Sequence, residues 1–394
     1  MSATNPQDSV LPTRFVNLVA ARSVFGDRVD RVGRHLLRSD DLADRVIASF
    51  EGRKDAWPML ERSLAGERIP EAPEPLRELV ETAAHVPAWL DWEAADRGGA
   101  LLMRAGPLGG AVLGARSLVL GYASPGGNKP LVFSGRLKEQ ASRRLNETAR
   151  FVQAVSRPGG MRPFADGWQI TLKVRQIHAQ VRKMILASGR WDAAAWGVPA
   201  NQHDLAGTTL LFSASIIDGL RKLGMRIAAE EAESYIHLWR WVGRTIGVDP
   251  DILPASEAEA MRLADLIEMT MGDPDKDSRD LTRALFDSAY EGCVTRDELR
   301  DAQRRVMFGR LICRELVGND LADKLAVPVT PIRYAMPMLK RFITGFERFA
   351  RAVPFGDRAA VAVGSHYWDR VVEIGLQGAT YEFPLPKRLA DLAA

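Results

Sequence analysis

The amino-acid sequence predicts an all-α fold in a single domain over residues 1–394. Long segments with apolar residues at helical spacing dominate the chain, and the short alternating segments that are typical of strands are sparse. The composition, 46% hydrophobic and 26% charged residues, is ordinary for a chain with a large core. The length exceeds the size at which single cores usually split, but we still expect one helical domain elaborated with additional helices.

The expected helices follow one another along the chain, separated by segments rich in proline, glycine and aspartate. Residues 10–65 hold two or three helices, and residues 69–75, stiffened by three prolines, form a linker. Residues 76–122 are helical, and a turn-rich loop follows at 123–130. The later helices are expected at 135–155, 167–185, 205–223, 227–247 and, after an Asp-rich solvated turn, at 279–325.

The helix expected at 167–185 carries the most informative residue, His178. Its apolar positions recur at helical spacing: Ile170, Val174, Val181 and Ile185. His178 falls inside this stripe, and Thr171, Arg175 and Arg182 share its side of the helix. A buried imidazole flanked by two guanidiniums needs an electron-pair acceptor and an anionic group. Haem offers both, since its iron binds a ring nitrogen and its propionates bind arginines.

A plainer interpretation of His178 stands beside this one. A lone histidine on an apolar helix face is more often a core residue whose ring is hydrogen-bonded to a carbonyl group. The helix at 135–155 changes the balance, because Arg144 and Thr148 interrupt its apolar stripe four residues apart. Either Arg144 pairs with a distant carboxylate and Thr148 bonds to its own helix, or both residues face a pocket and point toward a ligand or dioxygen.

These two helices carry a resemblance to a known family. The runs Arg144-x-x-x-Thr148-x-x-Phe-Val and Val-Arg-x-x-His178-x-x-Val-Arg resemble the haem-dependent oxygenases that include latex clearing protein and the MpaB-like oxygenases. Further similar segments follow in order over the part of the chain that the resemblance covers, residues 110–250: Trp196–Asp204, Thr208–Ser213, Glu233–Gly243 and Gly247–Val248.

The resemblance implies a non-covalent haem b in a globin-like helical core spanning residues 110–250, with residues 1–75 and 270–394 as peripheral helical extensions. It implies that His178 is the proximal ligand of the iron and that Arg144 and Thr148 lie on the distal side. Arg175, Arg182 and Thr171 are the expected propionate-binding or supporting residues.

One position departs from the pattern of the family's rubber-degrading members. They have a lysine that can bind the iron just before the matching threonine, and this chain has Glu147. Because a carboxylate is a much poorer haem ligand than an amine, we expect water or an open position there, with Glu147 as a candidate proton acceptor in catalysis. The acidic catalytic residue of those enzymes corresponds to a position near Asn128.

Charge and composition limit the partners. The net charge is +3 with acidic and basic residues interspersed, so no nucleic-acid partner is expected. The chain begins with a polar segment that lacks a basic and apolar leader, which favours the cytoplasm.

The apolar stretch 101–122 is too interrupted to span a membrane. The basic and aromatic segment 336–351 could lie on a membrane surface, but an amphipathic helix covering the core is favoured.

The sequence therefore predicts a haem b-dependent oxygenase that uses dioxygen to cleave or oxygenate an apolar, unsaturated or isoprenoid-like compound. Two other classes stay open: a non-catalytic haem-binding sensor or carrier, and a cofactor-free helical scaffold in which His178 only packs. The two cysteines, Cys293 and Cys313, form neither a disulfide framework nor a zinc pattern.

Overall fold

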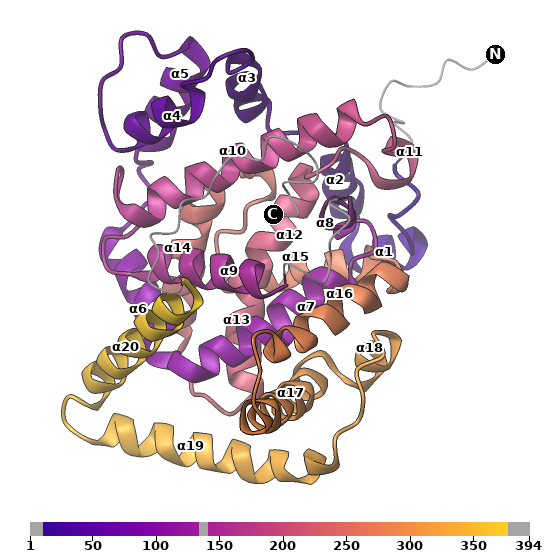
Figure 1. The fold of residues 1–394 in the computed structure, drawn as a ribbon, viewed down its shortest axis with the longest axis vertical. Coiled ribbons are helices and arrows are strands. Elements are labelled where there is room, and N and C mark those ends of the chain that lie inside the picture. Colours follow the sequence, from indigo (N-terminus) through magenta and orange to yellow (C-terminus); the bar gives the residue numbers. More distant parts are fainter. Residues whose placement is uncertain (1–10, 134–140, 377–394) are drawn as a thin grey trace.

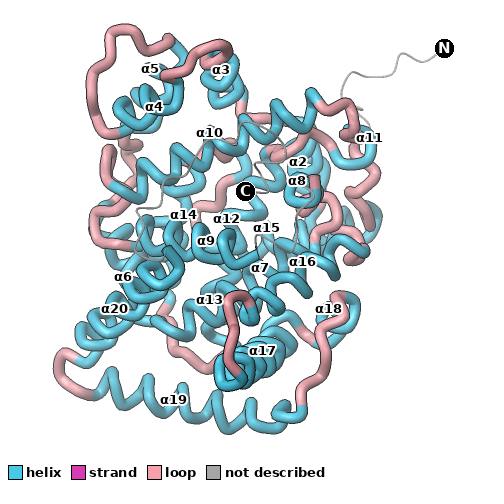
Figure 2. The backbone as a smooth tube through the Cα atoms, viewed as in Figure 1, coloured by secondary structure: helices cyan, strands magenta, loops and turns pink. Residues whose placement is uncertain are grey.

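The computed structural model describes residues 11–133 and 141–376, in which the all-α prediction is confirmed (Figures 1 and 2). Apart from one isolated bridge between Phe15 and Met271, the described residues form helices and loops. The first helices are α1 (Leu18–Phe25), α2 (Arg28–Arg34), α3 (Asp41–Ser49), α4 (Ala56–Leu64), α5 (Glu74–Ala84), α6 (Trp92–Val112), α7 (Leu118–Ala123) and α8 (Lys129–Val132). 

The middle of the chain supplies the centre of the molecule, where α9 lies in front and α10 crosses above it (Figure 1). These helices are α9 (Ala141–Ser156), α10 (Asp166–Ala187), α11 (Ala193–Trp196), α12 (Gln202–Phe212), α13 (Ala214–Lys222) and α14 (Ala229–Thr245). The remaining helices are α15 (Glu257–Thr270), α16 (Lys276–Asp287), α17 (Arg296–Val317), α18 (Asn319–Lys324), α19 (Met336–Ala352) and α20 (Gly356–Leu376).

The two helices that the sequence singled out are present. The prediction for 167–185 is confirmed by α10, whose apolar positions Ile170, Val181 and Ile185 are buried. The prediction for 135–155 is confirmed from Ala141 onward, and residues 135–140 lie outside the described part. α9 packs directly against α10, so the two motifs are neighbours in space as well as in sequence.

Two predicted helices are interrupted. The segment expected as one helix over 205–223 is split into α12 and α13 at Ser213, whose φ and ψ of −112° and −86° are not helical. The apolar stretch 101–122 bends within α6 at Gly106, where φ is +47° and Pro107 follows. It then widens into a π-helical turn, η2 (Leu113–Ser117), before α7.

The last helix, α20, packs closely on α6 (Figure 1). A Cβ atom at Gly364 would lie only 1.7 Å from the carbonyl oxygen of Met103, so glycine permits this contact between two backbones. Next to it, the fully buried Trp368 donates its indole N–H to the carbonyl of Leu102 at 3.3 Å. The C-terminal helix therefore completes the core.

The segment 336–351 forms α19 at the lower edge of the molecule in Figure 1. It contacts the core through Met336, Ile343 and Glu347, which are its buried residues. The side chains of its phenylalanines are exposed. This is contrary to the expectation that the apolar face of an amphipathic helix here would cover the core. Within the described residues, no helix combines the length and the apolar composition that crossing a bilayer requires.

Candidate functional site

His178 lies on α10 with its ring only partly accessible. Its Nδ1 atom is buried and has no hydrogen-bond partner, so the carbonyl bond of an ordinary core histidine is not observed. Burial, as the main cause, and the Arg182 guanidinium together lower the pKa of His178 to about 4, and Asp40 opposes both. The imidazole is therefore neutral at neutral pH, the form in which a histidine can bind a metal.

Arg175, one turn before His178, is held by a carboxylate. Its Nε donates to Asp40 Oδ2 at 2.6 Å and its Nη2 donates to Asp40 Oδ1 at 2.9 Å, and both side chains are buried. Asp40 also accepts the backbone N–H of Ala43 at 3.2 Å and so caps α3. The contacts of Arg175 thus fasten α10 to the start of α3.

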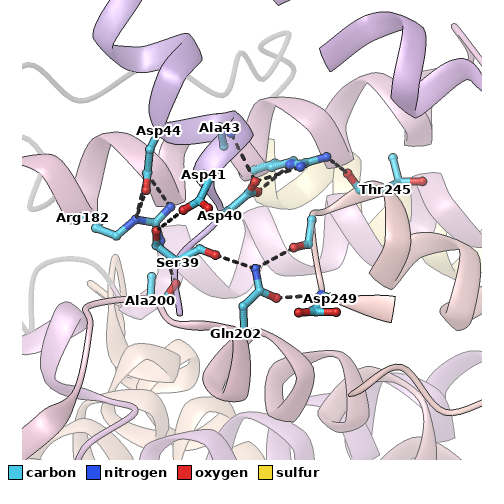
Figure 3. Close-up of polar contacts among 12 residues, drawn as sticks. Ser39, Asp40, Asp41, Ala43, Asp44, Arg182, Ala200, Gln202, Thr245 and Asp249 are labelled. Carbon is cyan, nitrogen blue, oxygen red and sulfur yellow. Dashed lines mark hydrogen bonds and ion pairs between the residues drawn. The ribbon is translucent and has the colours of Figure 1, made fainter. Parts of the chain in front are cut away.

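Arg182, one turn after His178, makes the matching contact. Its guanidinium donates to both carboxylate oxygens of Asp44 at 2.7–3.1 Å, and its Nη1 donates to the carbonyl of Ala200 at 2.8 Å (Figure 3). His178 therefore sits between two guanidiniums whose charges are balanced by aspartates of α3 and the residue before it. These contacts favour a positioning role for Arg175 and Arg182 over propionate binding.

Thr171, the remaining predicted cofactor-binding residue, is fully buried. Its hydroxyl donates to the carbonyl of Gly167 at 2.6 Å in its own helix, with the sulfur of Met161 at 3.7 Å. Backbone bonding of this kind is usual for threonine inside a helix. The hydroxyl of Thr171 is therefore already used.

The segment before α3 is fixed by a buried amide. Gln202 donates to the carbonyls of Ser39 at 3.1 Å and Gly247 at 3.0 Å, and accepts the N–H of Asp249 at 2.7 Å (Figure 3). Gly247 has a φ of +94°, and a Cβ atom there would lie 2.1 Å from Asp40 Oδ2. Glycine at this position therefore leaves room for the ion pair between Asp40 and Arg175.

On α9, Arg144 and Glu147 form the second part of the site. Burial lowers the pKa of Arg144, while the nearby Tyr122 and Glu147 raise it. Burial raises the pKa of Glu147, and the neighbouring Arg143 and Arg144 oppose this change. Arg143 donates its Nε–H to Glu147 at 2.9 Å. A half-buried carboxylate with a raised pKa is suited to taking up a proton.

Thr148 differs in its hydrogen bonding from three buried threonines within helices. Thr171, Thr209 and Thr245 each donate to the carbonyl four residues earlier. Among the described residues the hydroxyl of Thr148 has no hydrogen-bond partner, and its side chain is only partly buried. The back-bonding alternative for Thr148 is therefore not observed, and its hydroxyl is available to a ligand.

The predicted site residues of α10 and those of α9 are not all joined to one another by direct contacts in the described part of the chain. No direct polar contact within the described part links His178 to Arg144, Glu147 or Thr148, although their helices pack together. Sequence reasoning missed Asp40 and Asp44, which lie about 140 positions before their arginine partners. The feature of the sequence that could have identified them is the placement of both aspartates at the start of a helix, now seen as α3.

Tyr122 and Asn128 were also not assigned a role. Burial raises the pKa of Tyr122, and the Arg144 guanidinium beside it lowers that pKa. The buried amide of Asn128 donates to the carbonyl of Tyr122 at 2.9 Å and to the hydroxyl of Ser278 at 3.1 Å. Asn128 therefore fixes the end of α7 near Arg144, and as a neutral amide it cannot replace a catalytic carboxylate.

The donor set of the site suits haem iron better than a metal held by protein side chains alone. Within residues 11–133 and 141–376, no cluster of three or more His, Cys, Asp or Glu side chains could hold a metal ion. A single neutral imidazole with an unbonded ring nitrogen is instead what a haem iron requires of the protein. His178 fits that requirement.

Comparisons with known proteins show the family and the fold of the chain. A family model described as "ER-bound oxygenase mpaB/B'/Rubber oxygenase, catalytic domain" matches residues 102–355. The Rubber oxygenase of Streptomyces sp. (strain K30) is 25% identical over 324 residues, covering 78% of this chain and 76% of that protein. The solved structure of latex clearing protein LCP in the closed state superposes with a TM-score of 0.69 and 21% identity, covering 90% of this chain and 95% of that chain. The last likeness shows a shared fold.

Proposed function

Because the chain belongs to the family of the ER-bound oxygenases mpaB/B' and the rubber oxygenases, we propose that it is a haem b-dependent oxygenase acting on an apolar, unsaturated, isoprenoid-like compound. The curated relative is a rubber oxygenase, which supports an unsaturated hydrocarbon as the substrate class. In cleavage of a carbon–carbon double bond, both atoms of one dioxygen molecule enter two carbonyl groups, so this reaction needs no added reductant.

The observation that carries the proposal is the state of His178. Its imidazole is neutral, partly accessible and without a hydrogen bond at Nδ1 in the middle of a rigidly held helix. His178 would hold the iron through a ring nitrogen, and haem b, when bound, supplies the centre that activates dioxygen. Arg175 and Arg182 keep α10 in place through Asp40 and Asp44.

The residues of α9 would act around the reacting molecules. We assign to Arg144 the role of a buried positive charge near the reacting molecules, and to Thr148 that of donating a hydrogen bond from its unbonded hydroxyl. Glu147 would accept a proton, because burial favours its neutral form. With the carboxylate of Glu147 in place of an amine, α9 would offer a bound haem no amine ligand at this position.

The test of this proposal is the spectrum and the oxygen consumption of the purified protein. We expect a Soret band from haem that acid acetone extracts. The variant His178→Ala should lose most of the haem and keep its helical circular dichroism. The matched control is His203→Ala, which removes another buried histidine, on α12. Full haem content in His178→Ala would exclude His178 as the ligand.

Activity separates the remaining alternatives. The wild-type protein with unsaturated isoprenoid compounds should consume one dioxygen for each pair of carbonyl groups formed. Haem without oxygen consumption on any such compound would favour a sensor or carrier. A colourless protein that binds no added haem would favour a scaffold.

A further inference from the structure

The exposed face of α19 carries an aromatic stripe. Its members recur at intervals of four, four and three residues, and their side chains are largely exposed: Met338 (72%), Phe342 (70%), Phe346 (57%) and Phe349 (67%). The rings of Phe342 and Phe346 are stacked, with their centroids 6.5 Å apart. Large apolar residues gathered on one exposed helix face indicate an interaction surface, because single exposed residues are ordinary and rows of them are not.

The charges beside the aromatic stripe have one sign. Arg341 and Arg348 are exposed and form no ion pair with any described residue. At about 100° per residue, both lie on the same edge of the stripe, roughly 100° around the helix from its centre. The one acidic residue of α19, Glu347, is buried and bound to Arg104 at 2.6 Å. The outward surface of α19 is therefore apolar and cationic, without an exposed carboxylate.

We propose that α19 docks the protein on the surface of an anionic lipid bilayer. A helix lies in the plane of a membrane interface when its apolar face enters the acyl region and its basic residues contact lipid phosphates. The aromatic stripe supplies the apolar face, and Arg341 and Arg348 supply the cations at its edge. The position of α19 at the edge of the molecule, away from α9 and α10, leaves this face open (Figure 1).

Charge also argues against a second copy of the chain as the occupant. If two α19 helices packed through their aromatic stripes around a two-fold axis, the arginines of both copies would border one contact. No exposed carboxylate on α19 would be available to neutralise them. Lipid phosphates neutralise the same arginines.

The experiment is co-sedimentation of the full-length protein with vesicles of phosphatidylcholine alone and of phosphatidylcholine mixed with phosphatidylglycerol. We expect binding to the anionic vesicles. Phe342→Ser together with Phe346→Ser should lower the partition coefficient by at least about tenfold. Arg341→Gln together with Arg348→Gln should lower it by roughly tenfold on anionic vesicles and much less on phosphatidylcholine.

The matched control removes exposed apolar side chains elsewhere. Val19 and Val294 are 84% and 87% exposed, outside α19, so Val19→Ser with Val294→Ser should leave binding unchanged. Absence of wild-type binding to both vesicle types, or equal loss in the control, overturns the proposal. A wild-type dimer that Phe342→Ser with Phe346→Ser converts to monomer, without vesicle binding, would assign the stripe to self-association. Vesicle binding is measured independently of haem content and of turnover of dispersed substrate. Failure of the docking proposal can therefore be told from failure of the proposed function.

Discussion

At the residue scale, the proposed chemistry depends on keeping a proton away from His178. An imidazole binds iron through an electron pair that protonation would occupy. Burial holds its pKa at about 4, and the cation of Arg182 acts in the same direction. Asp40, whose charge acts in the opposite direction, is already bound to Arg175. The protein thus keeps this histidine neutral over the pH range in which a free histidine would titrate.

The depressed pKa of His178 predicts an acid sensitivity of the cofactor-free protein. Between pH 6.5, the ordinary value, and about pH 4, the unfolded chain binds a proton at His178 that the folded chain excludes. The free energy of unfolding should therefore fall as the pH drops through this window, by at most about 3 kcal/mol. Urea unfolding of wild type and His178→Leu across the window measures this contribution as the difference between the two curves. Parallel curves would contradict the prediction.

Thr148 gives a second prediction at this scale. Thr148→Val preserves the shape of the side chain and removes its unbonded hydroxyl. If that hydroxyl stabilises the reacting oxygen, its loss should cost about 1.5–3 kcal/mol, which is roughly tenfold to a hundredfold in turnover. Oxygen uptake at matched haem loading measures the effect. Thr209→Val, which removes a hydroxyl bound to its own helix, is the control. Wild-type turnover in Thr148→Val would leave Thr148 as a packed residue only.

At the scale of elements, two ion pairs set the position of α10 relative to α3. Asp40→Asn tests the first pair, because asparagine still caps α3 while the charge that balances Arg175 is lost. We expect a loss of about 3–5 kcal/mol in unfolding free energy, since a buried guanidinium is left uncompensated. Glu78→Gln breaks an exposed pair with Arg45 and should cost under about 1 kcal/mol. Equal effects of the two substitutions on chemical denaturation would contradict this account.

The elements show how far sequence reasoning reaches. The spacing of apolar residues was enough to predict α10 and most of α9, because periodicity is local. It did not predict the break at Ser213, a residue without the backbone restriction of proline. For α19 the pattern predicted an amphipathic helix, but the aromatic face that was expected to cover the core is exposed. The aspartates that hold Arg175 and Arg182 come from a distant segment, which spacing alone cannot bring to α10.

At the scale of the whole molecule, the contact between α6 and α20 closes the core. Gly364→Ala would place a Cβ atom against the carbonyl of Met103, so we expect a loss of about 1–3 kcal/mol in unfolding free energy. Gly345→Ala on α19 is the control, because no atom lies within 4 Å of its Cβ position. Alanine there should be neutral or stabilise the helix by up to about 1 kcal/mol. Thermal unfolding of both variants measures the difference, and an unchanged melting temperature in Gly364→Ala would contradict the prediction.

The same contact has a consequence for biosynthesis. Trp368 and its partner Leu102 are 266 residues apart, so the ribosome makes α6 long before α20 exists. At ordinary rates of translation the interval is on the order of tens of seconds. During that time the nascent chain carries α6 with its glycine-rich apolar side uncovered, a surface that chaperones bind and that aggregates when they are absent. The appearance of α20, the last helix that the structure describes, therefore covers this side of α6.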